Sequence, residues 1–189
     1  GTLVPHGYAL EPKERVAPVM LYSSNAKMTL ARWPNENEKN QYLDSRPAEA
    51  GHKGMVSYTN VIDPGPTVAG IDRFNDVNFN NNGGTFSVAF DRMASWHNIS
   101  EVFLDGVLGK SWEWTYNQLK SVDLAAKEIT LKRGEISGIA ANKGSYFFFE
   151  NIIEEIDQPG EFYIDRSQGK LFFYPDAGFE QGITIIATL

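Results

Sequence analysis

Residues 147–175 have the sequence FFFENIIEEIDQPGEFYIDRSQGKLFFYP, and this stretch decides the fold class. EFYID and KLFFYP, at 161–165 and 170–175, alternate apolar and polar side chains and predict two strands with one face on a core. DRSQGK joins them, with Asp165 placed to cap the turn and Gly169 at the left-handed position of a bulged hairpin. The stretch therefore predicts an antiparallel hairpin.

The residues before this hairpin predict a turn and a short helix. In DQPGE, Pro159 and Gly160 fit the two central positions of a type II turn, which need a fixed φ and a positive φ. Four apolar residues of FENIIEEI fall at i, i+3, i+4 and i+7, which predicts one apolar helix face from Phe149 to Ile156.

The acids of this stretch raise the question of catalysis, and each also has a structural explanation. We expect them to face water and to hold turn geometry rather than to converge on a ligand. They are Glu150, Glu154, Glu155, Asp157, Glu161 and Asp165.

The rest of the chain is also β-like, with 17 Gly and 9 Pro and few long helical periods. Residues 19–22 and 27–33 predict a hairpin that ends before Pro34. Further strands are expected at 85–90 and 99–109, and a second hairpin at 119–123 and 128–131, whereas residues 35–83 predict mostly loop. The prediction is an all-β fold, mostly antiparallel and sandwich- or barrel-like, with one or two short helices, forming a single β-rich domain over residues 1–189.

Composition excludes several classes of protein. The 189 residues include no cysteine, which excludes disulfides, thiolate zinc sites and cysteine nucleophiles. The net charge of −7, from 17 basic and 24 acidic residues without a basic run, argues against a nucleic-acid partner. The apolar runs are too short to cross a bilayer, so no membrane partner is expected.

Catalytic and metal-binding patterns are weak. Glu161 and Asp165 are the one acid pair that could share a strand face as a hydrolase would need, but they flank a turn. His6, His52 and His97 belong to no ligand-spaced motif. The segment DVNFNNNGG at 76–84 resembles the start of a calcium loop but lacks its glycine and its final glutamate, which favours a loop and leaves calcium open. We expect no catalytic residue, no metal and no cofactor.

The aromatic residues form the most specific pattern. In WEWTY, Trp112, Trp114 and Tyr116 share one side of a strand, and Trp96 lies nearby in the sequence. Flat rings on an exposed strand can stack on sugars, which makes these four residues candidates for carbohydrate binding. The alternative is that the three rings form the inward face of a β core, with Glu113 and Thr115 outward.

Four segments carry a resemblance to a known family. They are MTLARWPN at 28–35, FDRMASW at 90–96, VFLDGVLGKSWEW at 102–114 and FENIIEEIDQPGEFYIDRSQGKLFFYP at 149–175. In this order they resemble the insertion domain of bacterial right-handed parallel β-helix proteins related to glycoside hydrolase family 141, over nearly the whole chain from about Pro5.

The resemblance implies an accessory role. In such proteins the carbohydrate chemistry is expected on the β-helix, so no catalytic acid carries over and the parent protein is expected to be the glycoside hydrolase. The expected partners are the parent β-helix domain and a polysaccharide, and the expected location is extracytoplasmic, whether periplasmic, cell-surface or secreted. The function expected is a non-catalytic domain that packs on the β-helix and walls its substrate cleft, with a carbohydrate-binding module as the alternative. An insertion also predicts that Pro5 and Thr188 lie at the same end of the domain.

Overall fold

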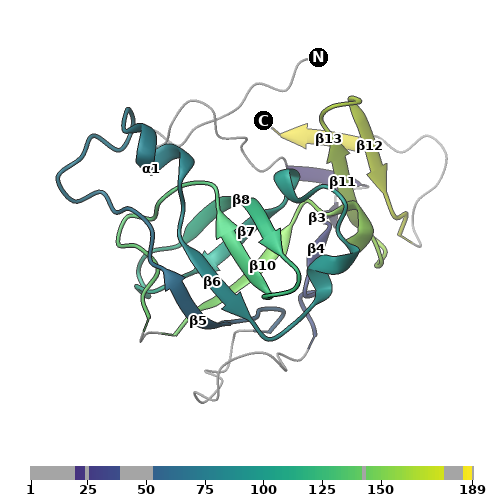
Figure 1. The fold of residues 1–189 in the computed structure, drawn as a ribbon. Helices are drawn as coiled ribbons and strands as arrows, with labels where there is room; N and C mark the ends of the chain where they lie inside the picture. The colour runs from purple at the N-terminus through teal and green to yellow at the C-terminus, as the bar shows by residue number, and fades with distance from the viewer. Residues whose placement is uncertain (1–19, 24–25, 39–52, 142–143, 177–184, 189) are drawn as a thin grey trace. The chain divides into compact units, whose positions relative to one another are not determined.

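The computed structural model describes residues 20–23, 26–38, 53–141, 144–176 and 185–188, and of the last segment only the backbone. These residues form short strands and a few short helical segments (Figure 1). In chain order they are β1 Met20–Ser23, β2 Ala26–Lys27, β3 Thr29–Leu30, β4 Arg32–Trp33, β5 Tyr58–Asp63, α1 Val77–Asn81, β6 Thr85–Val88, η1 Arg92–Ser95, η2 Ile99–Glu101, β7 Phe103–Val107, β8 Thr115–Asp123, β9 Glu128–Leu131, β10 Tyr146–Glu150, η3 Ile153–Glu155, β11 Glu161–Asp165, β12 Lys170–Phe173 and β13 Ile185–Thr188.

The chain divides into two compact units. The large unit is Arg32–Glu154, and the small unit combines the described residues of Gly1–Ala31 and Glu155–Leu189. This division does not test the expectation that residues 1–189 act as one domain, which stays a prediction.

The large unit contains a seven-stranded sheet in the order β4-β10-β7-β8-β9-β6-β5. Every neighbouring pair in it is antiparallel. The order has open ends at β4 and β5, and an isolated bridge links Val56, just before β5, to Phe147 in β10. The mostly antiparallel all-β fold class is therefore confirmed, and α1 is the one α-helix among the described residues.

Strand β10 supplies the centre of the large core. Phe147 and Phe149 are fully buried on one face, with their ring centroids 5.5 Å apart in a T-shaped arrangement. They belong to a cluster with Phe86, Leu104 and Trp96. Because full burial of one such side chain contributes about 1.5–3 kcal/mol, these rings account for much of the drive to form the sheet.

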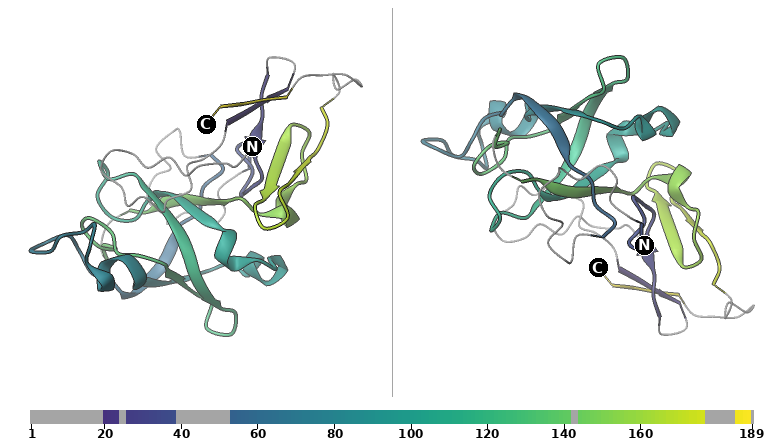
Figure 2. Two further views of the ribbon diagram at one scale, coloured as in Figure 1. Left: turned by 90° about the horizontal axis from the view of Figure 1, so that it is seen from above. Right: turned by 90° about the horizontal axis from the view of Figure 1, so that it is seen from below.

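The small unit contains two three-stranded sheets, β13-β1-β2 and β12-β11-β3. Its core is Leu21, Met28, Phe162 and Ile164. In the first sheet β1 and β13 pair antiparallel, with Met20 opposite Thr188, and Figure 2 shows these purple and yellow strands side by side. Pro5 lies outside the described residues, so the prediction about Pro5 and Thr188 is not tested.

The first predicted hairpin forms, but its return strand is divided. Strand β1 pairs with β2, as predicted. The residues after β2 then join other sheets, since β3 pairs with β11 in parallel and β4 pairs with β10. Strand β4 ends at Trp33, as expected before Pro34.

The predicted helix from Phe149 to Ile156 is wrong. Phe149 belongs to β10, and only Ile153–Glu155 form a single 3-10 turn. Asn151 has a φ of 62°, a left-handed conformation that ends the strand and cannot continue into a helix. Its side-chain amide donates to the carbonyl of Glu101 at 2.8 Å, which stabilises this bend.

Other strand predictions are confirmed by β6 and by the β8–β9 hairpin. The strand expected at 99–109 forms only over Phe103–Val107 as β7, because Ile99–Glu101 form a 3-10 turn instead. The asparagine-rich segment is not a loop throughout, because α1 begins within it. Asp76 caps this helix, since its carboxylate accepts from the amide of Phe79 at 2.7 Å, and Phe79 is buried.

No helix in the described part of the chain is both long and apolar enough to span a membrane.

The turns around β11 and β12 follow the predictions. Gly160 and Gly169 have φ values of 88° and 62°. The carboxylate of Asp165 accepts from the hydroxyl of Ser167 at 2.7 Å and from the amide of Gln168 at 2.9 Å, so it caps the hairpin turn. Strands β11 and β12 then pair with Asp165 opposite Lys170.

The conformation of Gly169 predicts the effect of a substitution. No atom lies within 4 Å of a Cβ built at this residue, so only the positive φ opposes a side chain. We expect Gly169→Val to lower the free energy of unfolding by more than about 1 kcal/mol, measured by equilibrium urea denaturation. Gly169→Asn is the matched control and should cost less, because asparagine tolerates this conformation. Equal costs for the two variants would contradict the prediction.

Candidate functional site

Two tryptophans just before β8 are the most exposed large aromatic side chains in the described residues. Trp112 and Trp114 are 71% and 55% exposed, whereas Glu113 and Thr115 are 8% and 4% exposed. The alternation predicted from the sequence is present, but its direction is opposite to the core interpretation. The acid and the hydroxyl point inward, and the two indoles point to solvent.

A buried polar cluster explains this direction. Thr115 donates its hydroxyl to one carboxylate oxygen of Glu135 at 2.6 Å, and the amide of Asn117 donates to the other at 2.5 Å. Glu113 accepts from the backbone amide of Ser137 at 3.2 Å. These contacts join the segment 113–117 to the chain that follows β9, so the indoles between them are held outward.

The cluster carries a buried acid with a perturbed pKa. Loss of solvation raises the pKa of Glu135 from 4.5 to about 7, because burial disfavours the charged carboxylate. The hydrogen bonds from Thr115 and Asn117 and the positive charge of Arg133 oppose this rise, and the charge of Glu113 adds to it. Glu135 is 6% exposed, which suits a structural group rather than one that contacts a large ligand.

Trp114 is also fixed from the outer face of the sheet. Its indole N–H donates to a carboxylate oxygen of Asp105 in β7, and its ring meets that of Tyr146 edge-on with the centroids 6.2 Å apart. Tyr116, half-buried in β8, stacks on Phe103 with the centroids 4.8 Å apart and the planes at 8°. The faces of such rings can contact the C–H face of a sugar. A carboxylate beside them can accept hydrogen bonds from the hydroxyl groups of the same sugar.

Trp96 does not belong to this surface. It is 5% exposed and packs on Phe149 and Trp33 at centroid distances of 5.1 and 6.3 Å. Its ring faces are covered by the core, so Trp96 is removed from the candidate binding residues. The other three candidates, Trp112, Trp114 and Tyr116, all remain accessible to some degree.

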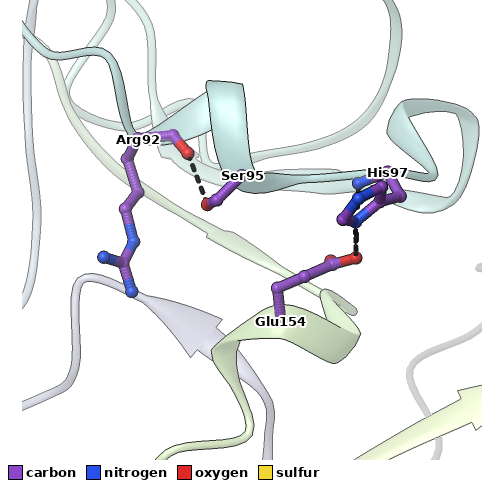
Figure 3. Close-up of polar contacts among 4 residues, drawn as sticks. All are labelled: Arg92, Ser95, His97 and Glu154. Atoms are coloured by element: carbon purple, nitrogen blue, oxygen red, sulfur yellow. Dashed lines mark hydrogen bonds and ion pairs between the residues drawn. The ribbon is translucent and has the colours of Figure 1, made fainter.

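Sequence reasoning missed a histidine–carboxylate pair in the large unit. The imidazole Nδ1 of His97 lies 2.6 Å from Oε1 of Glu154, and the same oxygen accepts from the backbone amide of His97 at 3.3 Å (Figure 3). Ser95 donates its hydroxyl to the carbonyl of Arg92 at 2.8 Å. The pair therefore orients an exposed imidazole, but the neighbouring hydroxyl is engaged by the backbone and supplies no activated nucleophile. Only a fold brings residues 97 and 154 together, so no local signal could have revealed the pair.

The acids of residues 147–175 do not all face water, which corrects the prediction. Three are buried: Glu150, Glu155 and Glu161, at 8%, 1% and 3% exposure. Burial alone does not distinguish a catalytic carboxylate from a structural one, so the role of a buried acid is judged from its hydrogen bonds.

Glu161 has a structural role within the small unit. One of its carboxylate oxygens accepts from the backbone amides of Asp157 and Gln158, both at 2.9 Å, so it holds the turn before β11. Loss of solvation raises the pKa of Glu161, and the two amides oppose the rise. The donors from Ser167 and Gln168 lower the pKa of Asp165. Each member of this acid pair is thus engaged by its own turn.

Metal ligands do not gather in the part of the chain that the structure describes. No group of three histidine, cysteine, aspartate or glutamate side chains is placed to hold an ion there. His6 and His52 lie outside the described residues.

Comparison with known proteins supports the fold alone. No protein-family model and no curated protein matches this chain. A solved structure described as "Glycoside hydrolase" superposes with a TM-score of 0.53 and 15% sequence identity, over 88% of this chain and 26% of that one. The chain thus spans about a quarter of the length of the protein it matches, and it shares a β-rich fold with part of a glycoside hydrolase.

Proposed function

We propose that this chain is a non-catalytic accessory domain of an extracytoplasmic carbohydrate-active protein, and that it contacts glycan through Trp112 and Trp114. The observation that carries the proposal is the exposure of these two indoles, 71% and 55%, beside residues that are buried and hydrogen-bonded. Exposure of an indole to water is unfavourable because most of its surface is apolar. A surface on which buried polar contacts keep two indoles exposed is therefore suited to stacking on a ligand.

The role as an inserted domain has separate support. The likeness covers 88% of this chain but only 26% of the glycoside hydrolase, as a domain within a longer protein would. Within the small unit, the antiparallel pairing of β1 with β13 brings an early and a late segment of the chain together. An inserted domain needs such neighbouring ends to leave and re-enter its host. Together with the resemblance of the sequence to insertion domains of β-helix proteins, these observations lead us to propose a parallel β-helix parent, on which this domain packs beside the substrate cleft.

Retention by polysaccharides tests the glycan contact. We expect the native chain to be slowed in affinity gel electrophoresis through at least one soluble polysaccharide. Trp112→Ala and Trp114→Ala should each weaken binding by about 5- to 30-fold, because each removes a stacking surface of about 1–2 kcal/mol. Phe74→Ala is the control, since Phe74 is an aromatic residue of the same unit that is 44% exposed. Binding that survives the double alanine variant would contradict the proposal.

A further inference from the structure

Asp105 lies between aromatic residues on the outer face of the large sheet. The register of β7 places it opposite Tyr116 in β8 and opposite Phe148 in β10. It is also the acceptor for the indole N–H of Trp114. One carboxylate thus borders the proposed stacking surface on the side of β7.

The second oxygen of Asp105 is available to a ligand. Oδ1 accepts a hydrogen bond from the indole N–H of Trp114. Oδ2 has no hydrogen-bond partner among the described residues, and it is not one of the fully buried polar atoms that lack a partner. Oδ2 therefore keeps some exposure to solvent. Partial loss of solvation raises the pKa of Asp105, while the Trp114 hydrogen bond and the charge of Arg32 oppose this rise.

We infer that Asp105 is the hydroxyl acceptor of this surface and that it makes the surface select neutral glycans over glycans of uronic acids. The inference rests on the proposed function and adds the chemical class of the ligand. A pyranose that stacks its C–H face on Trp114 presents hydroxyl groups at its rim, and a carboxylate oxygen accepts their protons in charge-assisted hydrogen bonds.

Charge supplies the selectivity. A uronic acid brings a second carboxylate toward a partly desolvated one, and like charges at close range in reduced dielectric repel each other. The net charge of −7 acts in the same direction. A purely apolar partner fits the surface less well. It would remove Oδ2 from water without supplying a hydrogen-bond donor, which is unfavourable for a charged oxygen.

Binding to a panel of polysaccharides tests this inference with Asp105→Asn. The asparagine keeps the size of the side chain and an oxygen for the indole of Trp114, but it removes the charge. We expect binding of neutral glucan, xylan or galactan to weaken about tenfold, and the preference for them over polygalacturonate and alginate to fall by at least as much. Asp91→Asn, which neutralises an exposed aspartate before η1, should leave both values unchanged.

The ratio of binding to neutral and to anionic polysaccharides distinguishes a role of Asp105 in specificity from a purely structural role. A variant that merely misplaces Trp114 would weaken neutral and anionic glycans alike and leave their ratio unchanged. If Asp105→Asn keeps the wild-type ratio while Trp114→Ala still weakens binding, the inference about Asp105 is overturned and the proposed function stands. Stronger wild-type binding to the anionic glycans would also overturn it. If the wild-type chain binds none of the panel, both fail.

Discussion

Gly106→Ala is expected to lower the free energy of unfolding of the large unit by more than about 3 kcal/mol. Gly106 lies within β7 at a φ of 150°, a conformation that side chains rarely adopt. A Cβ at this residue would lie 2.4 Å from the carbonyl oxygen of Tyr146 and 2.5 Å from the Cα of Phe147. Both are backbone atoms of β10, so the sheet itself would have to separate.

Urea denaturation followed by tryptophan fluorescence measures this cost. Gly70→Ala is the matched control, because Gly70 has a φ of 76° but no atom within 4 Å of a built Cβ. It should show only the backbone strain, about 1 kcal/mol. If Gly106→Ala costs no more than Gly70→Ala, the close approach of β7 and β10 is not what requires glycine.

The turns could be predicted from the sequence because their causes are local. Positive φ at Gly160 and Gly169 and the cap by Asp165 each depend on a few adjacent residues. A hairpin such as β11–β12 needs little else to set its register. Gly106 is the opposite case, because glycine is required there by the close backbone of β10, a strand about forty residues later in the chain.

The helix prediction failed because an eight-residue window cannot distinguish two structures. Apolar residues at 149, 152, 153 and 156 fit one helix face, but they also fit a strand that ends in a bend. Tertiary packing decides between them here, because Phe149 lies in the core at 0% exposure while Ile153 is 38% exposed. The left-handed Asn151 between them is stabilised by the distant carbonyl of Glu101.

The binding surface could be predicted only in part. Alternation in WEWTY correctly indicated that Trp112 and Trp114 share one exposure and that Glu113 and Thr115 share the opposite one. It could not indicate which side faces water, since that depends on Glu135, which holds Thr115 inward from 20 residues away. An inward Glu113 contradicts ordinary expectations for a charged residue. One of its carboxylate oxygens accepts from the backbone amide of Ser137, and this contact cannot be read from the local sequence.

Glu135→Gln is expected to stabilise the protein at neutral and alkaline pH. Folding raises the pKa of Glu135 from 4.5 to about 7, so between these values the folded state holds a proton that the unfolded chain has lost. The free energy of unfolding should therefore be greatest below pH 4.5 and fall as the pH rises to 7, by up to about 3 kcal/mol from this residue. Above pH 7 the penalty of a buried charge is fully present.

Glutamine should remove this dependence without losing the local contacts. Its carbonyl oxygen can accept from the amide of Asn117, and its amide can donate to the hydroxyl of Thr115, as a protonated glutamic acid would. We expect the variant to match the wild type near pH 4 and to exceed it by up to about 3 kcal/mol at pH 8.

Urea titrations at several pH values between 4 and 8 measure the difference between the two proteins. Taking the difference cancels the contributions of other acids, including Asp105 and Glu161, whose pKa values burial also raises. Glu38→Gln makes the same chemical change at an exposed glutamate and should leave the pH dependence of the wild type intact. A Glu135→Gln protein whose stability falls between pH 4.5 and 7 as steeply as the wild type would show that Glu135 is not the group that titrates.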